Sequence, residues 1–241
     1  MLNVLVTGSR GFLGRALKSR LQQNPEIRVL EFCRGDSDSL LFEYIKVADF
    51  IFHCAGEVRP ESLDSDFQSS NRELTEKMVG FLLECDKKTP VLLTSTIHAI
   101  DPRSAYGETK LASEKALAYY ANSQSVPEWI YRLPHVFGPG CKPNYNSVIT
   151  TWIYNSVHEL DINVFNRDIE MNYSFSLDLV DSFLLHLQDT SSSGCIYITP
   201  DKMYTTTLGV VVDLLDIFRL NENAFLSKIK KDSFEGKLLL S

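Results

Sequence analysis

A glycine-rich string that directly follows the first apolar run constrains the fold of this chain more than any other feature. In VTGSRGFLG, three glycines at three-residue spacing separate an expected strand over residues 2–6 from an expected helix. Glycines at such a junction let the backbone turn tightly and approach a pyrophosphate, whose charge then faces the N–H groups at the start of the helix. The alternative is an ordinary glycine turn. The string predicts a dinucleotide site formed by Gly8, Arg10, Gly11, Phe12, Leu13 and Gly14.

Short apolar runs alternate with longer segments of helical period through the first half of the chain. The expected strands cover residues 2–6, 27–33, 49–54, 91–95 and 129–133. The expected helices cover residues 12–24, 64–88 and 104–122, with a shorter one over 40–47. This alternation predicts an α/β fold of the Rossmann type, in which a doubly wound parallel sheet carries helices on both faces.

Beyond Gly138 the alternation fades into a segment rich in Pro, Asn and Gly. Helices are expected near residues 148–158 and 208–220, with mixed short elements between them, and the apolar cluster at 238–240 is not expected to form an element of its own. We therefore expect a cofactor-binding core over residues 1–138 and a small, mainly substrate-binding lobe over residues 139–241.

Net charge and cysteine usage indicate where in the cell this chain is expected and what it is not expected to bind. The formal net charge of -7 and the pI near 5.3 argue against a surface that binds nucleic acid. The five cysteines are scattered without a C-x-x-C pair, and neither they nor the five histidines have metal-ligand spacing, so reduced thiols and no metal are expected. No signal peptide is recognisable, and no apolar run approaches the roughly 18 residues of a membrane span. We expect a cytoplasmic protein that binds neither nucleic acid nor a membrane.

The end of the second expected strand bears on cofactor choice. NAD-specific sites place an acidic side chain there to accept hydrogen bonds from the ribose 2′-hydroxyl, and this acid would repel a 2′-phosphate. In this chain the strand leads to Arg34, and Arg10 in the glycine string can approach the same phosphate. NADP(H) is therefore favoured over NAD, although Asp36 lies close by and arginines at strand ends are common.

Tyr106 and Lys110 stand four residues apart at the start of an expected helix, so they lie on one face, one turn apart. A neighbouring ammonium favours the phenolate, which is expected to lower the pKa of the tyrosine and let it exchange a proton. Ser95 and Thr96 end the preceding strand, where a hydroxyl can polarise a substrate carbonyl. A Tyr and Lys at this spacing also occur by chance, but their order after the glycine string favours a catalytic group.

The strings GSRGFLG, HCAG, LLTSTIHA, YGETK and RLPHVFGPG together resemble the extended short-chain dehydrogenases across nearly the whole chain. The resemblance implies that Thr96 is the catalytic hydroxyl, with Ser95 beside it, and that Ala55, Gly56 and Lys110 line the cofactor. It also implies that Pro134 and His135 lie at its nicotinamide end. Asn71 precedes a helix and either positions the cofactor loop or caps the helix.

CKPNYNSVITTW carries a closer resemblance, to the reductase half of the bifunctional capsular polysaccharide enzymes on the way to UDP-N-acetyl-L-fucosamine. It implies NADPH-dependent reduction at C4 of a UDP-2-acetamido-2,6-dideoxy-4-hexulose to the 6-deoxy-L-talose sugar, and a homodimer. The family's C-terminal cupin domain, which epimerises C3, is expected to be absent from this chain. A UDP-sugar pocket should gather cationic and amide side chains, and the candidates are Lys142, Asn144, Asn146 and Arg167.

Three other functions fit the same fold. A sugar 4,6-dehydratase would carry an Asp-Glu pair directly after the catalytic hydroxyl, where this chain has Ile97 and His98. An NAD-dependent 4-epimerase would be expected to end the second strand on an acid in place of Arg34. A non-enzymatic NADP sensor usually lacks the Tyr and Lys that this chain retains. The reductase is therefore the favoured prediction.

Overall fold

In the computed structural model of this chain, residues 1–59, 61–145, 147–189, 191–220 and 227–241 are described. The chain divides into two compact units, the first formed by Met1–Leu133 and Val180–Pro200 and the second by Pro134–Leu179 and Asp201–Ser241. The predicted division at residue 138 differs from this one in two places. The second unit begins at Pro134, and the segment from Val180 to Pro200 returns to the first unit.

The first unit is built on a six-stranded sheet with the order β2-β1-β3-β4-β5-β8, all of whose described pairings are parallel. Its strands are β1 (Leu2–Thr7), β2 (Ile27–Phe32), β3 (Phe50–His53), β4 (Val91–Thr96), β5 (Pro127–Leu133) and β8 (Gly194–Ile198). From β1 the strand order runs to β2 on one side and to β3 on the other. The carboxyl edge beside β1 is therefore the switch point at which α/β sheets bind their ligands.

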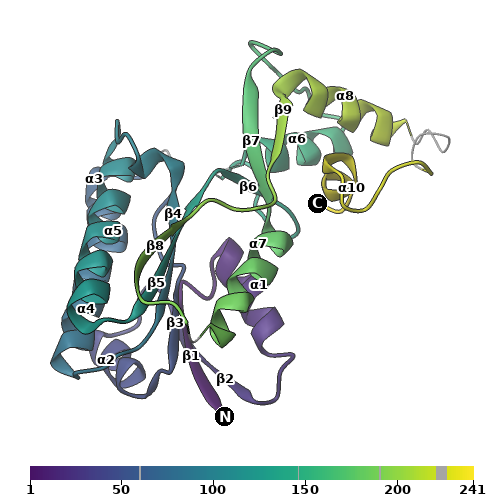
Figure 1. The fold of residues 1–241 in the computed structure, drawn as a ribbon. Coiled ribbons are helices and arrows are strands. Elements are labelled where there is room, and N and C mark those ends of the chain that lie inside the picture. Colours follow the sequence, from purple (N-terminus) through teal and green to yellow (C-terminus); the bar gives the residue numbers. More distant parts are fainter. Residues whose placement is uncertain (60, 146, 190, 221–226) are drawn as a thin grey trace. The chain divides into compact units, whose positions relative to one another are not determined.

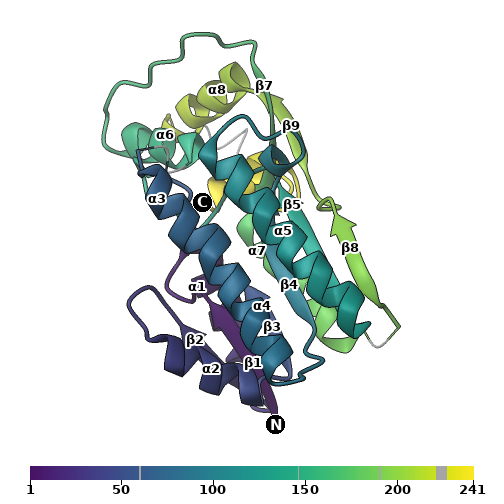
Figure 2. The ribbon, with the colours of Figure 1, turned by 90° about the vertical axis from the view of Figure 1, so that its left-hand side faces the viewer.

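Helices cover both faces of this sheet (Figures 1 and 2), as a doubly wound fold requires. One face carries α2 (Asp38–Val47), α3 (Asp64–Phe67), η1 (Gln68–Glu73), α4 (Leu74–Glu84), η2 (Ile97–Ala99) and α5 (Ala105–Gln124). The other carries α1 (Phe12–Leu21) and, after Leu179, α7 (Ser176–Leu185), which ends in η3 (His186–Gln188). The core under α2, α4 and α5 includes Leu41, Ile45, Met78, Leu82 and Leu117.

The sequence predicted most of these elements. The α/β fold with a doubly wound parallel sheet is confirmed. The single helix expected over 64–88 is wrong in detail, because the segment is divided into α3, a π-helical turn in η1, and α4. π-helical turns occur frequently at functional sites, and this one contains Asn71, which is buried.

The second unit has its own core around a three-stranded sheet with the order β6-β7-β9. Its elements are β6 (His135–Phe137), α6 (Val148–Val157), β7 (Glu170–Phe175), β9 (Tyr204–Thr207), α8 (Leu208–Arg219) and α10 (Phe234–Leu239). The last of these is a correction, because the cluster at 238–240 was not expected to form an element. Leu238 and Phe234 are buried with Phe137 and Tyr173 in this core, so burial stabilises a short terminal helix whose sequence alone gives no helical period.

Candidate active site

The glycine string forms the turn between β1 and α1, and Gly8 and Gly14 have no room for a side chain. Gly8 has a φ of +69°, and a Cβ there would lie 2.7 Å from the Ala55 backbone. A Cβ on Gly14 would collide with the carbonyl oxygen of Gly8. Gly11 is the N-cap of α1, and no side chain caps the helix. The N–H groups at the start of α1, which include those of Phe12 and Leu13, thus lie where a pyrophosphate can accept from them.

Gly56 lies beyond the end of β3, directly against the side chains of Asn71 and Lys110. A Cβ on Gly56 would lie 2.7 Å from Asn71 Oδ1 and 3.0 Å from Lys110 Nζ. The structure thus brings together three residues that the sequence predicted at the cofactor. Ala55, next to Gly56, donates its backbone N–H to Thr7 Oγ1 at 3.2 Å, so the segment after β3 is tied to the end of β1.

Both polar atoms of the Asn71 side chain form hydrogen bonds within the protein. Its Oδ1 accepts from the N–H of Glu57 at 2.8 Å, and its Nδ2 donates to the Glu57 carbonyl and to Thr109 Oγ1. Of the two roles predicted for Asn71, this geometry supports positioning of the loop after β3.

A buried histidine that the sequence did not single out extends this network. Thr75 donates its hydroxyl hydrogen to the Asn71 carbonyl, so it can only accept from His53 Nε2, 2.8 Å away. His53 Nδ1 then accepts from Thr7 Oγ1 at 2.6 Å. Burial, with a smaller effect of Lys110, lowers the pKa of His53 to about 3. His53 is therefore a neutral connector between β1 and α4.

Tyr106 and Thr96 meet at the end of β4. Their side chains lie close enough to interact, and Thr96 Oγ1 accepts from the N–H of His98 at 3.3 Å. The ring of Tyr106 packs between those of Phe67 and His98, with centroids 5.9 and 6.2 Å away. A phenol and a hydroxyl held side by side can both bind one carbonyl oxygen.

Lys110 lies one turn further along α5 and is buried, with its Nζ donating to the Thr94 carbonyl at 2.8 Å. Burial lowers its pKa to about 8, against a smaller opposing effect of Cys54 and Glu114. Burial also raises the pKa of Tyr106, while its interaction with Thr96 acts in the other direction. The expected lowering of the Tyr106 pKa is therefore wrong for this structure, because the loss of solvation on burial outweighs the lowering effect of Thr96. A raised pKa keeps the phenol protonated, as a proton donor requires.

Ser95 does not join this group. Its hydroxyl donates to Glu114 Oε1 at 2.5 Å, and Arg132 donates to both oxygens of the same buried carboxylate. Successive side chains of a strand point to opposite faces, so Ser95 and Thr96 cannot both face Tyr106. The geometry thus argues against Ser95 as a catalytic hydroxyl and favours a role in holding Glu114 and Arg132.

The two predicted cofactor-binding arginines differ in their surroundings. Arg10 is exposed in the glycine loop. Arg34 lies just beyond β2, and its Nη2 donates to Glu57 at 2.9 Å and to Ser70 at 3.1 Å. The Asp36 side chain accepts a hydrogen bond from the Cys33 N–H at 2.7 Å and so closes the turn that follows β2.

The sequence missed an acid on β2. Glu31 accepts from Ser9 of the glycine loop and from Lys18 of α1, both at 3.1 Å. Because Lys18 forms an ion pair with it, this carboxylate already has a cationic partner. The alternation of side chains along β2, read together with the glycine string, was the signal that could have identified it.

The remaining predicted residues lie in the second unit. Lys142 is exposed with its Nζ 6.0 Å from the centroid of the Tyr145 ring. Asn144 has a φ of +51° and donates its N–H to Thr151 Oγ1. Arg167 donates to the Gly209 carbonyl and to Asp213 of α8. Asn146 lies outside the described residues.

Pro134 and His135 follow β5 directly and lead into β6. The His135 ring lies 6.0 Å from that of Tyr173, measured between centroids. Their predicted place at the nicotinamide end of the cofactor stays a prediction.

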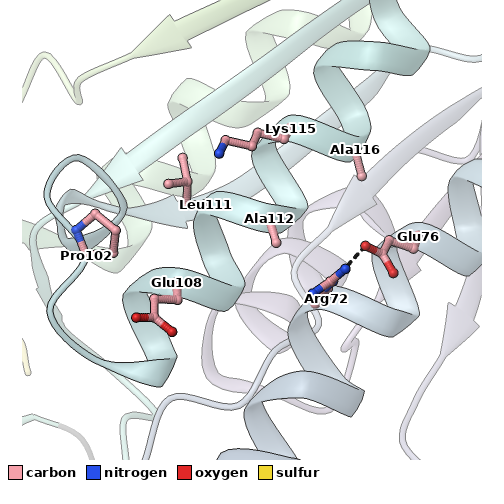
Figure 3. A pocket seen from close by; sticks show the side chains of 8 residues that line it. All are labelled: Arg72, Glu76, Pro102, Glu108, Leu111, Ala112, Lys115 and Ala116. Carbon is pink, nitrogen blue, oxygen red and sulfur yellow. Dashed lines mark hydrogen bonds and ion pairs between the residues drawn. The ribbon is translucent and has the colours of Figure 1, made fainter.

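A shallow groove of about 420 Å³ lies elsewhere in the first unit (Figure 3). Its walls are residues of η1, α4, α5 and the loop before α5, namely Arg72, Glu76, Pro102, Glu108, Leu111, Ala112, Lys115 and Ala116. None of the predicted site residues lines it, since Lys110 and Glu114 lie on the buried stripe of α5. The groove is therefore separate from the group around Tyr106.

Neither a membrane-spanning helix nor a cluster of metal ligands occurs among the described residues. No described helix is both long enough and apolar enough to cross a membrane. Within the same residues, no three His, Cys, Asp or Glu side chains are grouped so that they could hold a metal ion.

Known proteins resemble this chain over nearly its whole length. A Pseudomonas aeruginosa protein named UDP-2-acetamido-2,6-beta-L-arabino-hexul-4-ose reductase is 34% identical over 218 residues, 90% of this chain and 58% of that protein. The crystal structure of the capsular polysaccharide assembling protein CapF from Staphylococcus aureus matches with a TM-score of 0.83 at 33% identity, over 99% of this chain and 64% of that one. This chain thus spans about three fifths of the length of either relative.

The fold is shared more widely than the sequence. A UDP-glucuronic acid 4-epimerase from Bacillus cereus, solved in complex with NAD, matches with a TM-score of 0.85 at 15% identity over 100% of this chain and 97% of that one. A family model described as the NAD dependent epimerase/dehydratase family matches residues 4–198. The chain therefore belongs to the NAD dependent epimerase/dehydratase family.

Proposed function

We propose that this protein catalyses the NADPH-dependent reduction of the C4 keto group of a UDP-2-acetamido-2,6-dideoxy-4-hexulose to the 6-deoxy-L-talose sugar, in the synthesis of a surface polysaccharide precursor. One observation carries the proposal. Tyr106, beside Thr96 and one helical turn from the buried Lys110, stands at the carboxyl edge of the sheet that also holds the glycine loop.

Each residue of the group has a defined task in this reaction. A bound nicotinamide cofactor supplies the hydride. Thr96 and Tyr106 hydrogen-bond the carbonyl oxygen, and Tyr106 donates its phenolic proton to the oxygen as negative charge develops there. Lys110, held against the Thr94 carbonyl, provides a positive charge that stabilises the phenolate left behind.

The reductase from Pseudomonas aeruginosa supports this substrate class, since its name describes a 4-keto sugar carried by UDP. Within the second unit, Lys142, Asn144, Asn146 and Arg167 are the proposed contacts for the UDP-sugar. Arg167 has the weakest case, because Asp213 and the Gly209 carbonyl already accept its hydrogen bonds. A homodimer, which the family resemblance implies, and the cytoplasmic location predicted from the sequence belong to the same proposal.

Use of NADPH rather than NADH is supported by charge at the end of β2. Arg34 follows this strand, and the acid on it, Glu31, is paired with Lys18. A 4-epimerase that retains NAD gains no specific support, because Glu31, the acid bonded to the glycine loop, already has a cationic partner.

Thr96 and Ser95 provide a matched pair of variants for the assignment of the carbonyl-polarising hydroxyl. Thr96→Val is expected to lower the turnover by about a hundredfold, because a donor to the oxyanion is lost. Ser95→Ala is expected to leave turnover close to wild type and to lower thermal stability instead, because Ser95 contacts Glu114. Steady-state kinetics and thermal melts of both variants test this. A large loss of turnover in Ser95→Ala with Thr96→Val unaffected would contradict the assignment.

The overall proposal is tested by supplying purified protein with a UDP-linked 4-keto-6-deoxy hexosamine and following NADPH oxidation. Oxidation that depends on the sugar, and is faster with NADPH than with NADH, is the expected result. Absence of oxidation with any UDP-4-keto sugar would contradict the proposed reaction.

A further inference from the structure

A buried carboxylate beyond β3 holds two arginines that come from different strand ends. Glu57 is only 2% exposed, and its Oε2 accepts from Arg34 Nη2 at 2.9 Å and from Arg59 Nη2 at 3.0 Å. Its Oε1 accepts from Arg59 Nε at 3.0 Å. Arg59 thus binds Glu57 with two side-chain nitrogens, while Arg34 reaches the same carboxylate from the segment after β2.

The backbone completes the shell around Glu57. The N–H groups of Val58 and Arg59 both donate to Oε1 at 3.0 Å. Five donors on one carboxylate exceed its roughly four lone-pair positions, so neither oxygen is left for a ribose hydroxyl. These hydrogen bonds hold the pKa of Glu57 well below its usual range even though burial acts in the opposite direction. Glu57 is therefore a charged anchor, and it is unlike the acid that an NAD site presents to ribose.

Glu57, Arg34 and Arg59 lie at the edge of the sheet where the adenosine end of a dinucleotide cofactor would bind. β2 and β3 are the two strands that flank β1, and the glycine loop follows β1. Arg34 and Arg59 follow β2 and β3, so both lie at the carboxyl edge on either side of the loop's strand. Both guanidinium groups reach solvent, with side-chain exposures of 66% and 39%.

We propose that Arg34 and Arg59 together form a two-guanidinium site for the 2′-phosphate of NADP(H), and that Glu57 is the residue that positions them. The inference rests on the proposed use of NADPH, and it adds one binding residue and one positioning residue to it. The cluster of two guanidiniums and one carboxylate has a net charge of +1. A dianionic phosphate monoester matches this charge and the planar donor geometry of arginine.

If Glu57 acted only through its negative charge, its effect on phosphate binding would have the opposite sign. A carboxylate that only offset the arginine charge would weaken phosphate binding, and its removal would strengthen it. A positioning carboxylate keeps two long side chains in one arrangement before the ligand arrives, and its removal restores their rotamer freedom and weakens binding. Whether removal of Glu57 weakens or strengthens phosphate binding therefore distinguishes a positioning role from a purely electrostatic one.

Binding of adenosine 2′,5′-bisphosphate and of 5′-AMP, measured by isothermal titration calorimetry, tests the proposal without turnover. The two ligands differ only in the 2′-phosphate. Wild type is expected to prefer the bisphosphate, and Arg34→Gln and Arg59→Gln are each expected to weaken it by about tenfold. Affinity for 5′-AMP should stay at the wild-type value. Arg28→Gln removes the same charge from the exposed first half of β2 and should change neither affinity.

The outcomes separate this inference from the proposed function. If Arg34→Gln weakens bisphosphate binding and Arg59→Gln does not, the two-arginine site is wrong while the preference for NADPH stands. If wild type binds both ligands equally, the preference and the site fail together. Glu57→Gln, checked for folding by circular dichroism, is expected to weaken bisphosphate binding selectively, and stronger binding by this variant would overturn its positioning role.

Discussion

Tyr106→Phe is expected to lower the turnover of the keto sugar by about a thousandfold, because a positioned proton donor contributes about 10²–10⁴ to such a step. The change removes one oxygen and keeps the ring that packs between Phe67 and His98. Affinity for NADPH should hardly change, since the cofactor's phosphates are bound elsewhere. The measurement is steady-state turnover together with NADPH affinity by fluorescence titration.

A matched control lies on the same helix. Tyr119 of α5 is 65% exposed, and Tyr119→Phe should keep wild-type turnover. Unimpaired turnover in Tyr106→Phe would remove the phenol from the mechanism. An equal loss of turnover in Tyr119→Phe would show that helix α5 is sensitive to any such change.

Lys110 is expected to impose the alkaline limit on turnover. Its pKa is lowered to about 8, chiefly by burial, so Lys110 is an ammonium below that pH and loses its charge above it. Because the pKa of Tyr106 is raised, the phenol stays protonated over the same range. The pH profile of turnover should therefore be level below pH 8 and fall by about tenfold per unit above it.

Substitution of the same residue gives the larger effect. Lys110→Met is expected to lower turnover at neutral pH by about a thousandfold and to abolish the alkaline limit in the remaining activity. Lys115→Met, on the exposed stripe of α5, should retain the wild-type profile. A wild-type profile that is level through pH 9 would contradict the role assigned to Lys110.

Local patterns were enough to predict the cofactor-binding part of the sheet. The strands that end at Thr7, Phe32, His53 and Thr96 lie where the short apolar runs predicted them, because parallel strands buried on both faces read as continuous apolar runs. The edge strand β8 was missed. It is a short, half-exposed segment that pairs with β5, and a partner so distant along the chain leaves no local pattern.

In the site, too, local sequence patterns predicted contacts within one element and missed those between distant segments. Spacing within one helix was enough to bring Tyr106 and Lys110 together, and strand alternation could have separated Ser95 from Thr96 beforehand. The pKa of Tyr106 could not be inferred, since it depends on burial by Phe67 and His98 from other segments. Glu57 and Arg59 were missed for a related reason, because Glu57 joins Arg59 to Arg34, which is more than twenty residues away along the chain.

Hydride transfer to the sugar is the central claim, and NADPH that carries deuterium on the transferred position of the nicotinamide tests it most directly. After incubation with the UDP-4-keto sugar, mass spectrometry and NMR of the product should find one deuterium at C4 and one cofactor oxidised for each sugar reduced. A product without deuterium, or a 4-epimerised sugar formed with no net oxidation of the cofactor, would contradict the assignment.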